Sequence, residues 1–371
     1  MVVSRRPRWS RRRLWRVLAW LAVAAVALTV LAFDVDRFLY GGATVLRVGA
    51  SPGPLVVSPD GRTIYLANST DSITPVSAAT GKAGKPIAIS GGSPGDYGSG
   101  GLAITPDGQT LFATVFSDAA TVNALALARV DLRTGREAGQ IRVPGGASFF
   151  VLSRDGTTLY VVSGDGTLTA VDAATDRPER RIPVPRSLLA NEVAMVLSPD
   201  GGTLYVATLD ASAWTGAVTP VSLRTGAPGR AVAVGWEPAS LAITPDGRTL
   251  YAAVDGLDGE AGQVAPNRVV AIDTATDRVR ASLPWRAPPL YLAMAPDGAT
   301  LWVASIIGGR WSTAENTVTP VSVADGQPGA PFRTSGCLND GEVSPSGIAV
   351  SRGGRTLYVT VPAGLETFGI S

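Results

Sequence analysis

The sequence contains no histidine, and this absence removes several kinds of chemistry. Without an imidazole group, the chain cannot build Ser-His-Asp or Cys-His catalysis, ligate haem through histidine, or form most zinc and copper sites. Catalysis could then use only carboxylates, lysine, tyrosine, arginine or a metal bound by carboxylates. The missing histidine therefore favours a binding protein over an enzyme.

Cysteine and lysine are almost absent as well. Cys337 is the single cysteine, so the chain has no internal disulfide and no cysteine metal cluster. A redox or quinoprotein-like function is accordingly the least favoured. Of the 32 basic residues, only Lys82 and Lys85 are lysines, and charged residues make up 17% of the chain.

The formal charge of +2 is concentrated at the N-terminus. Seven arginines lie before residue 17 and no acid does; taking these seven charges from +2 leaves −5 for the remainder. They are Arg5, Arg6, Arg8, Arg11, Arg12, Arg13 and Arg16. Because the rest of the chain is mildly acidic, we expect no nucleic-acid partner.

A basic head, residues 1–13, precedes the apolar run Leu14–Phe33, whose only charged residue is Arg16. About 20 apolar residues suffice to cross a bilayer as a helix, and an arginine near the end can reach the headgroups. We therefore predict a transmembrane helix, or uncleaved signal anchor, over residues 14–33, followed by a linker over 34–42. The positive-inside rule places the N-terminus in the cytoplasm and the rest of the chain outside it, attached to the cell membrane by this single pass.

Two alternatives concern export. Val30, Leu31 and Ala32 suit a signal peptidase, in which case residues 1–32 are cleaved and the protein is secreted, but the apolar run exceeds the usual length. Ser10–Arg16 also resembles a twin-arginine signal. We favour the retained anchor and the ordinary export route.

The remaining chain repeats one pattern of strand, tight turn and strand, represented by Leu241–Val254 (LAITPDGRTLYAAV). In the turn, proline fixes φ, aspartate bonds nearby backbone and glycine tolerates positive φ. The turn position is occupied by Asp60, Asp107, Asp155, Asp200, Asp246, Asp297 and Gly353, at steps of 47, 48, 45, 46, 51 and 56 residues. This period and the all-β content predict a seven-bladed β-propeller over residues 43–371.

Each turn unit is followed by a second hairpin, such as Val218–Val234, so each blade is expected to have four antiparallel strands, a to d from the axis outward. The C-terminal stretches Ile348–Thr360 and Leu365–Ile370 supply only three strands. We predict that Ala43–Val48 is the fourth, outer strand of the last blade, which closes the ring and leaves no open edge.

The phrases SPDGRTIYLAN, VTPVSLRTG and SGIAVSRGGRTLYVT resemble the repeats of the YVTN family of seven-bladed β-propellers. The resemblance covers about residues 43–371. It implies a propeller fold and an extracytoplasmic location. It implies no particular activity, because propellers carry many unrelated functions.

Strand order predicts two different ends of the ring. The a–b and c–d turns share one end, which we call the regular end; the b–c and d-to-next-a connections share the other, the variable end. The variable end carries most insertions and acids, and is therefore the expected binding face. Lys82, Lys85 and several arginines fall at the regular end, as does Ala43, and we predict that this end faces the lipid.

Candidate ligand-binding residues lie on variable-end loops, where tryptophan offers rigid area and a polar tip. They are Trp214, Trp236, Glu237, Trp285, Arg286, Arg310 and Trp311. The alternative role for the tryptophans is to fill gaps between blades. Asp255, Asp258 and Glu260 offer oxygen ligands for Ca²⁺, although their spacing differs from that of an EF-hand loop.

The favoured function is a membrane-anchored binding module for a protein, a peptide or a cell-envelope component, with no cofactor and no catalytic residue. The alternative is a lactonase- or hydrolase-like propeller, using a pair such as Glu237 and Arg286 or bound Ca²⁺ to activate water.

Overall fold

The structure is a computed structural model that describes residues 44–370 apart from 47, 49–51, 69, 93–100, 116–125, 148, 164, 185–191, 211–212, 214, 257–264, 308–314, 335–346 and 362–363. The predicted head, transmembrane helix and linker lie outside these residues. Within the described part, no helix is long and apolar enough to cross a bilayer.

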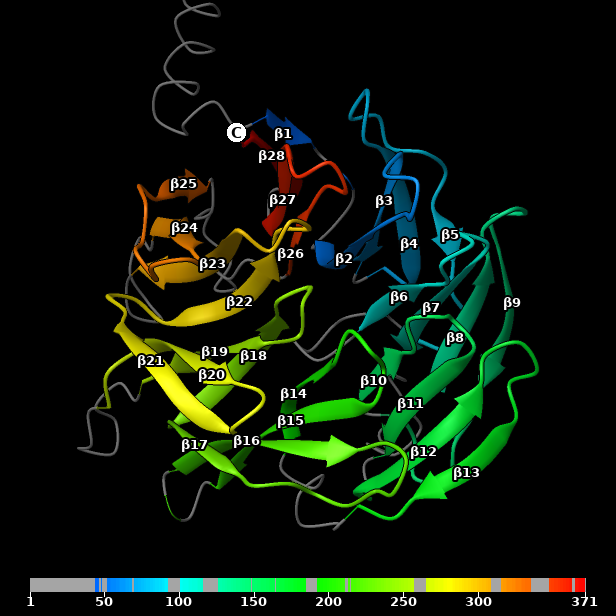
Figure 1. The fold of residues 1–371 in the computed structure, drawn as a ribbon. Helices are drawn as coiled ribbons and strands as arrows, with labels where there is room; N and C mark the ends of the chain where they lie inside the picture. The colour runs from blue at the N-terminus through cyan, green and yellow to red at the C-terminus, as the bar shows by residue number, and fades with distance from the viewer. Residues whose placement is uncertain are drawn as a thin grey trace, which may run out of the picture. The chain divides into compact units, whose positions relative to one another are not determined.

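Residues Thr44–Ser371 form one unit of seven four-stranded antiparallel sheets around a common axis (Figure 1), which confirms the predicted propeller. The first three blades are β2 (Pro52–Val57), β3 (Thr63–Asn68), β4 (Ser72–Ser77) and β5 (Ile87–Ala88); β6 (Leu102–Ile104), β7 (Thr110–Val115), β8 (Ala126–Asp131) and β9 (Arg136–Ile141); and β10 (Phe149–Leu152), β11 (Thr158–Ser163), β12 (Thr167–Asp172) and β13 (Pro178–Ile182).

The next three blades follow the same order. They are β14 (Glu192–Leu197), β15 (Thr203–Asp210), β16 (Thr215–Ser222) and β17 (Val232–Gly235); β18 (Glu237–Ile243), β19 (Thr249–Asp255), β20 (Arg268–Asp273) and β21 (Arg278–Pro284); and β22 (Pro289–Met294), β23 (Thr300–Ile307), β24 (Glu315–Ser322) and β25 (Phe332–Thr334).

The seventh blade joins the two ends of the unit. It contains β26 (Gly347–Val350), β27 (Thr356–Val361), β28 (Gly364–Gly369) and, as its outer strand, β1 (Thr44–Leu46). Thr44 pairs with Thr367 and Leu46 with Leu365. The predicted closing strand is thus confirmed over Thr44–Leu46, within the predicted range 43–48.

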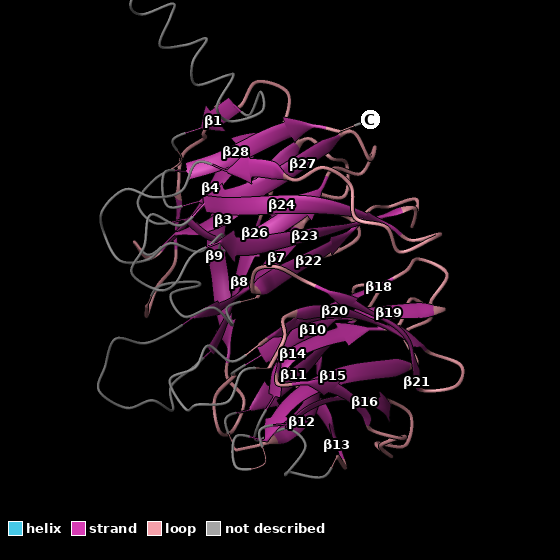
Figure 2. Cartoon of the chain, turned by 90° about the vertical axis from the view of Figure 1, so that its left-hand side faces the viewer, coloured by secondary structure: helices cyan, strands magenta, loops and turns pink. Residues whose placement is uncertain are grey.

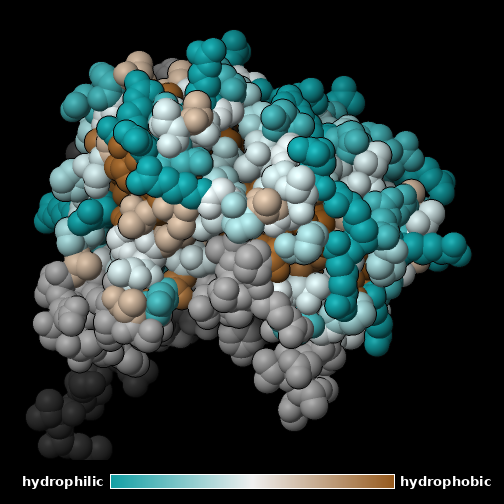
Figure 3. Space-filling view, turned by 60° about the horizontal axis from the view of Figure 1, so that its bottom comes forward, coloured by the Kyte–Doolittle hydropathy of each residue, from teal (hydrophilic) through white to brown (hydrophobic). Residues whose placement is uncertain are grey.

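Strand order within every sheet gives a–b and c–d turns at one end of the ring, as predicted. In the side view of Figure 2, hairpin turns of several blades project on the right, where the C-terminus also lies. On the face drawn in Figure 3, polar side chains surround small, separated apolar areas.

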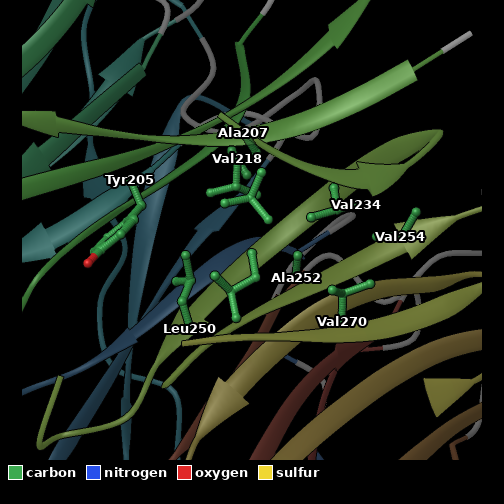
Figure 4. Close-up of a cluster of buried hydrophobic side chains, with 11 residues drawn as sticks. Tyr205, Ala207, Val218, Val234, Leu250, Ala252, Val254 and Val270 are labelled. Atoms are coloured by element: carbon green, nitrogen blue, oxygen red, sulfur yellow. The ribbon is translucent and has the colours of Figure 1, made fainter. Parts of the chain in front are cut away.

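Apolar side chains fill the spaces between neighbouring blades. In the cluster shown in Figure 4, Tyr205, Ala207 and Val218 of the fourth blade meet Leu250 and other residues of the fifth. Leu250, Ala252 and Val254 lie two residues apart on β19 because alternate side chains of a strand share one face. Each sheet therefore contributes both of its faces to the core.

The a–b turns of the first five blades share one hydrogen-bonding pattern. In the first blade, the Ser58 hydroxyl donates to Asp60 Oδ1 at 2.6 Å and accepts from Thr63 N at 2.9 Å, while Asp60 Oδ1 also accepts from Arg62 N at 3.0 Å. The donated hydroxyl bond is the main reason why the pKa of this aspartate lies below its usual value. The same bond lowers the pKa of Asp107, Asp155, Asp200 and Asp246. These aspartates hold hairpins together, and their repetition reflects the fold.

The a–b turn of the sixth blade lacks the hydroxyl group of this pattern. Ala295 occupies the hydroxyl position, although Asp297 Oδ1 still accepts from Ala299 N at 2.9 Å. We expect Ala295→Ser to raise the free energy of unfolding by about 0.5–1 kcal/mol, because both partners of the new hydroxyl are already in place. Urea denaturation would measure this. Ser58→Ala should shift stability by a similar amount in the opposite direction, and equal stability of all three proteins would contradict the assignment.

Candidate functional site

The two ends of the ring are built differently. All seven a–b connections have five residues, from 58–62 in the first blade to 351–355 in the last. At the variable end, the single residue Trp236 joins β17 to β18, whereas residues 89–101 join β5 to β6 and residues 335–346 join β25 to β26. The c–d connections, which share the end of the a–b turns, have four to nine residues. Connection length therefore varies most at the variable end, which is where a ligand site can differ between proteins of this shape.

Polar residues on the inner strands gather in three neighbouring blades. The inner strand of each blade is mostly apolar, but β14 begins with Glu192, β18 carries Glu237 and Ser240, and β22 carries Tyr291. Ser240 Oγ accepts from Leu292 N at 3.2 Å and so joins the fifth blade to the sixth. Burial raises the pKa of the Tyr291 phenol, which stays protonated at neutral pH.

Two carboxylates lie opposite each other in the fifth blade. Glu237 at the start of β18 and Asp255 at the end of β19 are register partners, and both are half-buried. Asp255 shares a face of β19 with Tyr251 and Ala253, which pack against the sixth blade. The two acids therefore lie at the variable end of the space between blades five and six. A site of this kind can attract a cation or accept hydrogen bonds from a ligand.

The insertion that follows Asp255 has a fixed base. Gly256 N donates to Asn267 Oδ1 at 2.6 Å, and a Cβ at Gly256 would lie 2.0 Å from Ala265 O. The two ends of the insertion, Gly256 and Ala265, therefore meet closely.

The two described tryptophans of the predicted site pack into the ring. Trp236 is 9% exposed. Trp285 is half-buried, lies against the apolar cluster between blades five and six, and donates from Nε1 to Ser305 Oγ at 2.9 Å. Trp285 thus fills a gap between blades, the alternative role considered from the sequence, and Trp236 is buried.

The other predicted site residues are separate or undescribed. Arg286 is exposed next to Trp285, and among the described residues no ion pair joins it to Glu237. Trp214, Arg310, Trp311, Asp258 and Glu260 lie outside the described residues. In the part of the chain that is described, no group of three histidine, cysteine or acidic residues could hold a metal ion.

Sequence reasoning missed Ser240 and Tyr291, and it did not pair Glu237 with Asp255. A signal for the first two was present, because each is a polar residue in a stretch where the other repeats have apolar ones. The pairing depends on a register shift between Pro238 and Ser240 in β18, which the repeat pattern does not reveal.

Comparison with known proteins supports the fold. No family model matches the chain, and no curated protein does either. Among solved structures, Kuenenia stuttgartiensis hydrazine synthase is similar, with 21% identity, a TM-score of 0.68 and coverage of 88% of this chain and 98% of that one. The β-propeller domain of Myceliophteria thermophila Cps50 (Swd1) has 11% identity, a TM-score of 0.66 and coverage of 88% and 99%.

At these identities the likeness shows architecture alone. The chain is a seven-bladed β-propeller of four-stranded antiparallel blades, a class that commonly serves as an interaction or enzyme module.

Proposed function

We propose that this protein is a membrane-anchored, extracytoplasmic propeller of the YVTN type that binds a protein, a peptide or a cell-envelope component at its variable end. The observation that carries the proposal is the contrast between the two ends: seven a–b turns of five residues and c–d turns of four to nine residues at one, and connections of one to thirteen residues at the other. A rigid ring whose connections vary most at one end is suited to presenting binding loops there.

The details of the variable end agree with binding. Glu237 and Asp255 supply negative charge from neighbouring strands, and Gly256 and Asn267 hold the base of a loop beside them. The apolar run 14–33 and the arginines before it support the anchor and the orientation.

Affinity capture tests the proposal. The bait is residues 44–371, because this range contains every strand of the ring, including the closing pair β1 and β28. It is compared with a variant in which Asn-Gly replaces residues 257–264, a short link that suits ends which already meet. We expect the intact bait to retain an envelope component that the loop variant loses by at least about tenfold.

The matched control changes the regular end instead. Gln109, Arg248 and Gln327 are exposed, and each can be replaced by Ser. This control should retain the partner as the wild type does. If the loop variant retains the partner as well as the wild type does, this loop does not bind the partner. If the loop variant and the control lose the partner equally, the assignment of binding to the variable end is contradicted.

A carboxylate-dependent hydrolase is the second candidate, favoured by the pairing of Glu237 with Asp255. The same preparation can be assayed on lactones and esters with and without Ca²⁺. Turnover that Glu237→Gln abolishes would favour this candidate over the binding module.

A further inference from the structure

Five basic side chains gather where the seventh blade meets the first at the regular end. Arg352 and Arg355 belong to the a–b turn of the seventh blade, Arg62 to that of the first, and Lys82 and Lys85 to the c–d turn of the first. All five are exposed, and the two lysines are the only lysines of the chain. We call these five residues the basic seam patch.

Contacts between the turns make the patch continuous. Arg352 Nη1 donates to Pro59 O across the boundary between the blades. Within the first blade, Ala78 N donates to Arg62 O at 2.8 Å and so joins its two turns. A Cβ at Gly81 would lie 2.7 Å from Leu46 Cδ2, so the turn that carries the lysines rests against β1 of the seventh blade.

Few acids offset this charge. Asp60 is the one acid in these turns; its Oδ1 is bonded to Ser58 Oγ and Arg62 N, and its Oδ2 lies 4.0 Å from Arg62 Nε, so it offsets at most one of the five positive charges. The seventh blade has Gly353 where the other turns have aspartate. At the regular end of blades two to six taken together, by contrast, turn acids outnumber the turn arginines, although blade four has Arg224 and Arg230 with one acid. These acids are Asp107, Asp131, Asp155, Asp172, Asp176, Asp200, Asp246, Asp273, Asp277, Asp297 and Asp325. With these turn aspartates included, the excess of positive charge at the regular end is largest at the seam between blades seven and one.

The start of the ring lies at the same place. Thr44, the first residue of β1, pairs with Thr367 near the regular end of β28, and Ile370 N donates to Arg355 O at 2.9 Å. The predicted linker, residues 34–42, can span at most about 30 Å when fully extended. A chain that leaves a bilayer at residue 33 therefore keeps the patch close to the lipid headgroups.

We propose that the basic seam patch docks the propeller on anionic phospholipid headgroups, so that the regular end rests on the membrane and the variable end faces away from it. This inference rests on the anchoring proposed above. Each basic side chain near an anionic surface strengthens attachment about fivefold, and the linker supplies a high local concentration of lipid.

Vesicle sedimentation of residues 44–371 tests the patch without the anchor. The quadruple variant R62Q, K82Q, K85Q and R355Q removes four charges and keeps Arg352, whose bond to Pro59 joins two blades. The control R136Q, R224Q, R248Q and R278Q removes four exposed charges at the same end in blades two, four and five. Vesicles contain either phosphatidylcholine alone or a mixture with phosphatidylglycerol.

We expect the wild type to bind only the phosphatidylglycerol vesicles, and to bind them more weakly as salt is added. The patch variant should lose at least about tenfold in partition, and the control should stay within about threefold of the wild type. Equal losses in the two variants, or equal binding to both kinds of vesicle, would overturn the proposal.

Alkaline carbonate extraction of the full chain examines the anchor separately. If the full chain stays in the membrane pellet but residues 44–371 do not bind the anionic vesicles, the docking proposal is contradicted and the anchor is supported. If residues 44–371 bind the vesicles and the patch variant does not, the docking proposal is supported. This holds even if carbonate releases the full chain from the membrane.

Discussion

A chain that begins at Pro52 is expected to be less stable than one that begins at Thr44 by about 3 kcal/mol or more. The shorter chain lacks β1 and the residues after it, and so loses Val48, which is 2% exposed, and Leu46, which packs against the same apolar cluster. Burying a valine or leucine side chain stabilises a protein by about 1.5–3 kcal/mol. The loss also opens the outer edge of β28, where Leu365 and Phe368 are buried.

Urea denaturation of the two chains, followed by tryptophan fluorescence, would measure the difference. Val45→Thr in the longer chain is the control, because Val45 lies in β1 but is 40% exposed. This substitution should change stability by less than about 0.5 kcal/mol. Equal midpoints for the two chain lengths would mean that β1 does not close the ring in solution.

Gly216→Ala is expected to cost about 3 kcal/mol or more and to weaken binding at the variable end. A Cβ at Gly216 would lie 2.2 Å from Trp236 O and 2.6 Å from Pro238 Cδ. Both atoms belong to the segment that leads into β18, so the new methyl group forces backbone to shift. Such a shift displaces Glu237 from its position opposite Asp255.

Gly353→Ala provides the matched control for this substitution. Nothing lies within 4 Å of a Cβ at Gly353, and the residue is exposed. The midpoint of thermal unfolding of the Gly353→Ala variant should match that of the wild type. If Gly216→Ala unfolds at the same temperature as the control, the close approach of β16 to the start of β18 is not present in solution.

The sequence predicted the architecture well because the same local chemistry occurs in every repeat. Ser58, Asp60 and Thr63 form a turn whose hydrogen bonds are set by neighbours in the chain. Counting these turns gives seven blades. The unpaired strand at the start of the ring can then complete only the last blade, as its outer strand. The observed pairing of β1 with β28 confirms that inference.

The candidate site was harder to predict because it depends on contacts between repeats. Trp285 falls on a variable-end connection in the sequence, yet its packing against the cluster between blades five and six becomes visible only when the neighbouring blade is present. The partners Glu237 and Asp255 are brought together by a shifted strand register. The predicted contrast in charge between the two ends is also weaker than expected, because the turn aspartates lie at the regular end beside the arginines.

The seventh blade also determines when the ring can close during synthesis of the chain. β1 is the first strand of the ring to leave the ribosome, and its only partner strand, β28, is the last. The two are separated by more than three hundred residues, so their pairing must wait for the completed chain, and contacts of such long range form slowly. Until then, the outer edge of the seventh blade has no strand to pair with, and the nascent ring is most open to association with other chains.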